Sequence, residues 1–194
     1  MEEPFGTMSK LAVIFPGIGY HTDKPLLYFG KKLARTYGYE ILEVPYTHFK
    51  KGIKGNPEKM REAFFSALEQ TQEILSDVRW EEAEDILFIS KSIGTVVAAA
   101  FAEKKGLKVR HIYYTPLAET FTMAQSGNGI AFHGTADPWA SDRDIEDGCR
   151  QKEIPLTVIA DANHSLETGD VMTDLKNLLQ VMDVTEKWIA GGCA

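Results

Sequence analysis

The stretch DILFISKSIGTVVAAAFAEKK, residues Asp85–Lys105, decides the fold of this chain. Its first six residues are mostly apolar, which is typical of a strand buried on both faces of a sheet. A helix made of small residues, Thr95–Lys105, follows after only a few positions. A strand that passes so directly into a helix is the unit from which parallel sheets are built, so this stretch predicts an α/β fold.

The same alternation of strand and helix patterns continues outward in both directions. Apolar runs that end at Pro, Gly or polar residues predict six strands: Leu11–Pro16, Tyr39–Thr47, Asp85–Ser90, Lys108–Thr115, Gly129–Thr135 and Leu156–Asp161. Amphipathic spacing and helix-start signals predict five helices: Lys24–Gly38, Asn56–Val78, Thr95–Lys105, Ser141–Arg150 and Val171–Trp188. This order predicts a single domain, residues 10–194 after a tail of residues 1–9. We expect an open, mostly parallel six-stranded sheet with helices on both faces.

The composition of the 194 residues excludes several classes of protein. Hydrophobic residues make up 44% and charged residues 25%, which are ordinary values for a globular domain. The net charge of −7 argues against nucleic-acid binding, and the longest apolar runs, such as Ile93–Ala102, are too short to span a membrane. The N-terminus lacks the pattern of a signal peptide. Cys149 and Cys193 form no metal-binding pattern, so a reduced cytoplasmic protein is a simpler expectation than a disulfide.

Sites in open α/β sheets lie at the carboxyl ends of the strands, and Ser92 follows one of them. A serine on a sharp turn from strand to helix is the position of a nucleophile, for which the motif G-x-S-x-G is typical. Here the motif is SKSIG: Gly94 supplies the small residue after the serine, whereas Ser90 stands where glycine is usual. The alternative is that Ser92 only caps the helix that follows.

Two later strand ends supply an acid and a base. Asp137 follows the fifth strand in HGTADP, and His164 follows the sixth in ANHS. The chain order serine, acid, histidine is that of a hydrolase triad, in which the histidine takes the proton of the serine and the acid orients the histidine. Taken singly, Asp137 could cap a turn and His164 could be a surface histidine. Asp161 competes for the acid role but is more typical of a turn residue.

The end of the first strand, FPGIGY, predicts where backbone N–H groups would stabilise the negatively charged oxygen that forms when the serine attacks a carbonyl carbon. The backbone N–H of Ile18, together with that of Ile93 after the serine, would form an oxyanion hole. The alternative is that Pro16-Gly17 only ends a strand. Candidates for a substrate pocket are Gly17, Tyr20, Phe121, Met123 and Trp139. For the last three, burial as plain packing is the alternative.

The chain resembles the α/β-hydrolase superfamily, near its small, lidless esterase, thioesterase and dienelactone-hydrolase-like branches. The resemblance rests on four segments: FPGIGY, FISKSIGT, HGTADPW and ANHS. The resemblance covers roughly Lys10 to Ile189. It implies a serine hydrolase that cleaves a small carboxylic ester or thioester through an acyl-enzyme, without a cofactor or metal. The expected partner is that small molecule, not a nucleic acid or a membrane. Pro116–Asn128 is too short to build a helical cap, so we expect an open site and short acyl groups.

Two other functions remain as alternatives. Gly17–Thr22 (GIGYHT), with Glu40 or Glu43 about 20 residues further on, partly matches a dinucleotide-binding fingerprint. Thr22, however, stands where that fingerprint needs a residue small enough for close approach of the helix. The chain could also be a hydrolase-like fold that binds a ligand without catalysis, although an intact serine, acid and histidine argue against it.

Overall fold

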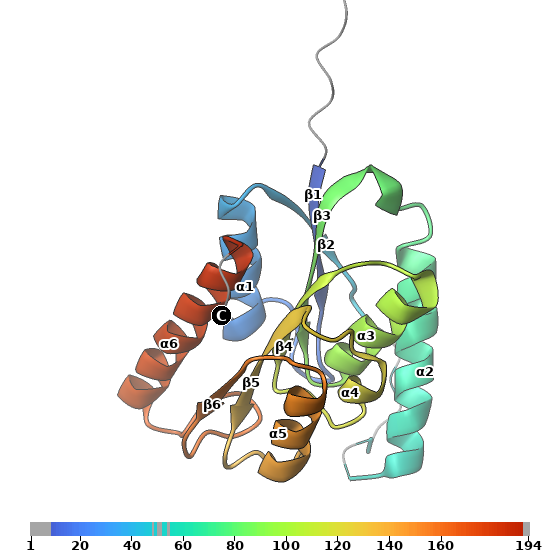
Figure 1. The fold of residues 1–194 in the computed structure, drawn as a ribbon. Coiled ribbons are helices and arrows are strands. Elements are labelled where there is room, and N and C mark those ends of the chain that lie inside the picture. The colour runs from blue at the N-terminus through green and yellow to red at the C-terminus, as the bar shows by residue number, and fades with distance from the viewer. Residues whose placement is uncertain (1–8, 48, 50–51, 54, 192–194) are drawn as a thin grey trace, which may run out of the picture.

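The computed structural model describes residues 9–47, 49, 52–53 and 55–191. Within this part of the chain, six strands form one open sheet in the order β2-β1-β3-β4-β5-β6, and all five pairings are parallel (Figure 1). The strands are β1 (Ser9–Phe15), β2 (Tyr39–Glu43), β3 (Ala83–Lys91), β4 (Arg110–Tyr114), β5 (Gly129–Gly134) and β6 (Leu156–Ile159). The predicted α/β fold with a six-stranded parallel sheet is therefore confirmed.

Helices cover both faces of the sheet. The helices are α1 (Pro25–Thr36), α2 (Pro57–Ile74), α3 (Ile93–Lys105), α4 (Thr120–Met123), α5 (Asp142–Gln151), α6 (Val171–Ile189) and the 3₁₀ turn η1 (Trp80–Glu82). Helices α1 and α6 pack on one face, and α2, α3, α4 and α5 lie on the other (Figure 1). The side chains of Asn56, Ser141 and Asp170 cap the starts of α2, α5 and α6, close to the predicted helix starts.

Three predicted boundaries differ from the structure. The strand predicted in the segment Tyr39–Thr47, with its end marked by Pro45, ends at Glu43, two residues before that proline, which has no N–H to donate to a sheet. Helix α2 ends at Ile74 rather than at Val78. The connection Pro116–Asn128, predicted as a loop, contains the one-turn helix α4.

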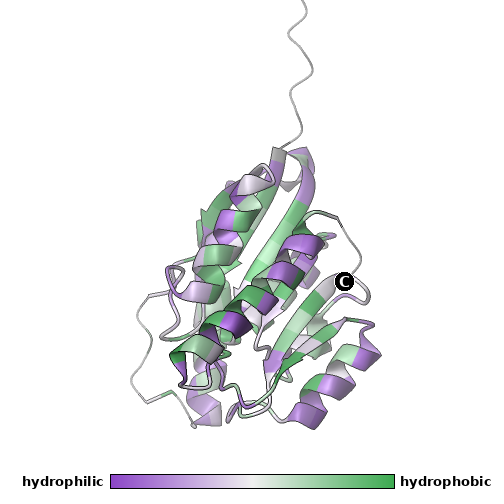
Figure 2. Cartoon of the chain, turned by 90° about the vertical axis from the view of Figure 1, so that its left-hand side faces the viewer, coloured by the Kyte–Doolittle hydropathy of each residue, from purple (hydrophilic) through white to green (hydrophobic). Residues whose placement is uncertain are grey.

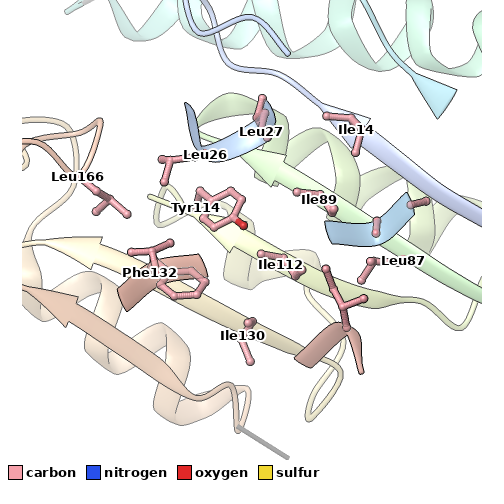
Figure 3. Close-up of a cluster of buried hydrophobic side chains, with 14 of the residues drawn as sticks. Ile14, Leu26, Leu27, Leu87, Ile89, Ile112, Tyr114, Ile130, Phe132 and Leu166 are labelled. Carbon is pink, nitrogen blue, oxygen red and sulfur yellow. The ribbon is translucent and has the colours of Figure 1, made fainter. Parts of the chain in front are cut away.

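Successive residues of the central strands enter different cores. In β1, Ala12 and Ile14 pack toward α1 and α6, whereas Val13 and Phe15 pack toward α2 and α3. Figure 3 shows the first of these cores, with side chains of the central strands packed beside Leu26 and Leu27 of α1. The strands are predominantly hydrophobic and the helices mixed (Figure 2), as expected where a parallel sheet is covered on both sides.

The strand order determines where a site can lie. The chain runs from β1 to β2 on one side of β1, and then crosses to β3 on the other side. Crossovers therefore diverge between β1 and β3, which is the kind of position where open α/β sheets bind ligands. The segment after Phe15 and the segment after Lys91 leave the sheet side by side at this point.

Candidate active site

Ser92 forms the turn between β3 and α3. Its backbone has φ 57° and ψ −128°, a left-handed conformation that is uncommon for residues with a side chain. The turn brings the end of β1 so close that a Cβ on Gly94 would lie 2.4 Å from the carbonyl oxygen of Phe15. A Cβ on Gly17 would lie 3.1 Å from the Cβ of Ser92. Glycine at these two positions therefore lets β1 pass directly beside the serine.

The remaining small residue of the motif is Ser90. Its side chain is fully buried, and its Oγ donates a hydrogen bond to the carbonyl oxygen of Ile112 at 3.0 Å. The N–H of Ser92 donates to the carbonyl oxygen of Tyr114 at 3.1 Å. The turn is thus tied to β4, and a serine replaces the usual glycine without leaving a buried hydroxyl unpaired.

The side chain of Ser92 contacts a histidine instead of capping α3. Although Ser92 occupies the N-cap position, its side chain makes no capping hydrogen bond. Its Oγ lies 2.8 Å from Nε2 of His164, and Nδ1 of His164 lies 2.6 Å from Oδ2 of Asp137. An ionised carboxylate can only accept, so Nδ1 carries the proton and Nε2 is left to accept from the serine hydroxyl.

Asp137 is held in its ionised form. Its side chain has no exposed surface, and burial alone would raise its pKa. The hydrogen bond from His164, the positive charge that His164 can carry and the N–H of Trp139, 2.8 Å from Oδ1, outweigh that effect, so the pKa of Asp137 is lowered. The competing acid, Asp161, lies in an exposed turn after β6, where its N–H donates to Thr135.

Backbone contacts fix the loop that carries His164. The hydroxyl of Thr115, at the end of β4, donates to the carbonyl oxygen of His164 at 3.1 Å. A Cβ on Gly134 would lie 2.2 Å from the carbonyl oxygen of Ala162, so the end of β5 presses against the same loop. The sequence analysis did not identify Thr115. The sequence feature that could have identified Thr115 is its position directly after a strand, because the carboxyl ends of the strands surround the site.

The candidate oxyanion hole lies beside the serine. Gly17 and Tyr20 exchange two backbone hydrogen bonds of 3.1 and 3.2 Å, which close a tight turn with Ile18 and Gly19 at its tip. Within the described part of the chain, the N–H groups of Ile18 and Ile93 have no protein acceptor. Both residues line a pocket of about 160 Å³ together with Ser92 and His164. Ile18 and Ile93 therefore line the same pocket as Ser92, as the predicted oxyanion hole requires.

Comparison with known proteins relates the fold to solved structures. No protein-family model and no curated protein matches the sequence. A serine hydrolase homologue from Coxiella burnetii matches 95% of this chain and 86% of its own, with a TM-score of 0.65 at 16% identity. A serine hydrolase without a lid from Xanthomonas campestris matches 95% of this chain and 86% of its own, with a TM-score of 0.59 at 11% identity. Est1E from Butyrivibrio proteoclasticus matches 96% and 89%, with a TM-score of 0.66 at 11% identity.

The chain has the fold of the small, lidless α/β hydrolases. At these identities the likeness concerns the fold alone, so the site must be judged on its own contacts. The α/β-hydrolase resemblance seen in the sequence is confirmed at that level.

Tyr20 anchors the Gly17–Tyr20 turn on this hydrolase fold. Its hydroxyl accepts a hydrogen bond from the N–H of Leu26 at 3.1 Å, near the start of α1. The buried ammonium of Lys91 lies 4.9 Å from the centre of its ring, a cation–π contact. Burial raises the pKa of Tyr20 to about 12, so its hydroxyl keeps its proton at neutral pH.

Two pockets meet at Ser92 and His164. We call the 160 Å³ pocket the serine pocket; its other lining residues are Ile18, Met60, Ile93, Leu117, Glu119 and Trp139. The second, of about 280 Å³, we call the histidine-loop pocket, because Asn163, His164 and Ser165 form one side of it. Tyr20 and Lys91 line its other side, and Trp139 lines both pockets.

The structure separates the candidate pocket residues predicted from the sequence. Trp139 and Tyr20 line the pockets at Ser92, and Gly17 lies directly beneath the serine. Met123 lines a neighbouring groove. Phe121 is buried in the core under α5, where a Cβ on Gly148 would lie 2.3 Å from its ring, so it packs as plain core. The lining residues missed include Met60 of α2 and Leu117, whose helix and loop have no motif that marks them. The sequence analysis also did not identify Lys91, Glu119, Asn163 and Ser165.

The contacts around Glu43 bear on the dinucleotide alternative. Its carboxylate accepts from Lys31 at 2.8 Å and from the hydroxyl of Thr22. An acid that binds a ribose must be open to solvent and ligand, whereas Glu43 joins α1 to β2, which argues against a dinucleotide site at Glu43.

Among the described residues, no three His, Cys, Asp or Glu side chains are grouped to hold a metal ion, and no helix is long and apolar enough to cross a bilayer. Cys149 is a buried free thiol, and Cys193 lies outside the described residues.

Proposed function

We propose that this protein is a serine hydrolase that cleaves a carboxylic ester or thioester through an acyl-enzyme. The observation that carries the proposal is the hydrogen-bonded series from Ser92 through His164 to Asp137, at 2.8 and 2.6 Å. A serine hydroxyl is a weak nucleophile until an adjacent base takes its proton. The series supplies that base in the correct tautomer and a buried carboxylate to orient it.

The reaction follows from these positions. Ser92 Oγ attacks the carbonyl carbon while its proton passes to Nε2 of His164. The N–H groups of Ile18 and Ile93 donate to the oxygen that becomes negative, and one such donor contributes about 2.7–4 kcal/mol to the transition state. Nε2 then gives its proton to the departing alcohol or thiol. Water, deprotonated by the same nitrogen, attacks the acyl-enzyme and releases the acid and free Ser92.

A related fold supports the substrate class. Est1E, which shares this fold, has been seen with ferulic acid bound, which is a small carboxylic acid. A carboxylic acid is the product that hydrolysis of an ester or thioester by Ser92 would release. Like that acid, the substrate of this protein would be a small molecule.

A fluorophosphonate probe with intact-mass readout tests the proposal. Because only an activated serine reacts with such a probe, we expect one label on the wild type and none on Ser92→Ala. The variant should also lose p-nitrophenyl acetate hydrolysis by at least about 10³-fold, with an unchanged circular dichroism spectrum. Labelling or full activity in Ser92→Ala would refute the role of Ser92. An unlabelled, inactive wild type would instead favour a ligand-binding protein without catalysis.

A further inference from the structure

A third pocket continues the serine pocket along α2. This pocket, the α2–α4 groove, has a volume of about 460 Å³. It shares four lining residues with the serine pocket: Met60, Ile93, Leu117 and Glu119. Helix α2 forms one wall and α4 the other, with α3 between them (Figure 1). The groove therefore adjoins the serine pocket through these four residues.

The lining of this groove is largely apolar. Phe64, Phe65 and Val96 line it beyond the shared residues, and Thr122 and Met123 form the wall on α4. Phe65 is 54% exposed, which is unusual for so large an apolar side chain on a helix that packs against a core. The guanidinium of Arg61, which also lines the groove, lies 5.7 Å from the centre of the Phe65 ring. An exposed aromatic side chain in a groove that adjoins the serine pocket is explained if a ligand covers it.

The position of the proton donor shows which side of the site is left for the acyl group. Nε2 of His164 must deliver a proton to the leaving atom, so the leaving group lies on the side of the histidine loop. The histidine-loop pocket is on that side and carries the polar groups of Lys91, Asn163 and Ser165. The acyl group stays bonded to Ser92 after the leaving group departs. The space left for it is the serine pocket and its continuation, the α2–α4 groove.

We propose that the α2–α4 groove binds the acyl chain, so that the substrate is an ester or thioester of a medium-chain linear acid. This inference rests on the proposed function. The sequence predicted short acyl groups because only loop side chains were expected to cover the chain. The structure adds a helical wall, α2, with Met60 and Phe64 facing the groove. Each methylene buried there raises kcat/KM by up to about fourfold, equal to about 0.8 kcal/mol.

The test is a series of p-nitrophenyl esters from acetate to octanoate on the wild type and two pairs of variants. Thr122→Trp fills the groove from α4, and Thr36→Trp is its control, since both threonines are exposed and bond a carbonyl of their own helix or turn. Phe65→Ser removes part of the apolar wall. Phe29→Ser is its control, because Phe29 is 42% exposed on α1, which packs on the opposite face.

We expect kcat/KM of the wild type to rise by about tenfold or more from acetate to hexanoate, as two or more methylenes become buried. Thr122→Trp should lower the ratio of hexanoate to acetate by about tenfold, and Phe65→Ser by about threefold, while both controls keep the wild-type ratio. A wild-type ratio of one or less would overturn the groove assignment, as would equal ratios in Thr122→Trp and Thr36→Trp. If acetate hydrolysis survives in Ser92→Ala, the proposed function fails rather than the groove.

Discussion

Each ring nitrogen of His164 faces a group that suits one protonation state. Nδ1 faces the carboxylate of Asp137, whose pKa is lowered, and Nε2 faces the hydroxyl of Ser92. Replacing the carboxylate by an amide of the same shape would offer Nδ1 a donor instead of an acceptor. The histidine would then carry its proton on Nε2, where it could not accept from the serine.

Asp137→Asn and Asp161→Asn test this argument side by side. Because Asp137→Asn imposes the wrong tautomer, we expect kcat for p-nitrophenyl acetate to fall by up to about 10⁴-fold. Asp161→Asn changes an exposed turn residue and should stay within about twofold of the wild type. The measurement is steady-state kinetics at pH 7.5. A loss confined to Asp161→Asn would mean that the acid has been assigned to the wrong residue.

The polar residues of the candidate site could be predicted from the sequence, because the end of a strand can be recognised where an apolar run ends. Ser92, Asp137 and His164 each follow an apolar run, and in a parallel sheet such ends share one edge. Thr115 follows a strand in the same way, but a threonine has no reactive group that marks it as important. Its role in orienting the His164 backbone depends on a contact between segments 49 residues apart, which no local pattern reveals.

At the scale of elements, the turn Gly17–Tyr20 is held from three directions. Its own backbone bonds close it, the Tyr20 hydroxyl ties it to Leu26, and the Lys91 ammonium packs on the Tyr20 ring. A turn that presents an N–H to a developing charge must be fixed before the reaction, because reorganisation during the reaction costs rate. In the proposed function, Tyr20 is therefore a positioning residue for the N–H of Ile18.

Tyr20→Phe tests that role by removing only the hydroxyl. The N–H of Leu26 loses its acceptor and the turn loses one of its three attachments, so we expect kcat to fall by about three- to tenfold with a smaller change in KM. Tyr37→Phe is the matched control, since it removes a hydroxyl that bonds Glu186 at the far end of α1. If kcat is unchanged while the unfolding midpoint falls, Tyr20 supports the fold and not the turn.

The helices that line the groove were the part of the site least visible in the sequence. Helix α2 was predicted from its apolar stripe, and the same stripe gave no sign that Met60 lines the serine pocket or that Phe64 lines the α2–α4 groove. An apolar residue at a helix surface has the same pattern whether it faces the core or a ligand. Helix α4 is a single turn inside a short connection, too brief for helical periodicity to appear.

At the scale of the whole molecule, the sheet buries a histidine whose ring nitrogens form no hydrogen bond within the described part of the chain. The side chain of His111 in β4 is 1% exposed and is stacked on Tyr113, with ring centres 4.8 Å apart. Neither ring nitrogen has a hydrogen-bond partner among the described residues. Burial lowers the pKa of His111 to about 3, so this side chain stays neutral in the folded protein.

This neutral histidine makes the stability of the fold sensitive to acid. In the unfolded chain a histidine titrates near 6.5, so between about pH 6.5 and pH 3 the unfolded state binds one more proton than the folded state. The free energy of unfolding must therefore fall as the pH falls through that window. For this one group the loss is about 2 kcal/mol between pH 7 and pH 5.

Urea denaturation of the wild type and His111→Phe at pH 7, 6 and 5 measures this loss. His111→Phe keeps an aromatic ring beside Tyr113 but has no proton to bind, so its free energy of unfolding should fall by about 2 kcal/mol less than that of the wild type between pH 7 and pH 5. His111→Phe can lose part of its stability at pH 7 through imperfect packing. Only the pH dependence of the free energy of unfolding therefore shows whether His111 is neutral in the folded protein. The control is His21→Gln, at an exposed loop position, which should follow the wild type at every pH. Parallel curves for the wild type and His111→Phe would mean that His111 is protonated inside the fold and has a partner there.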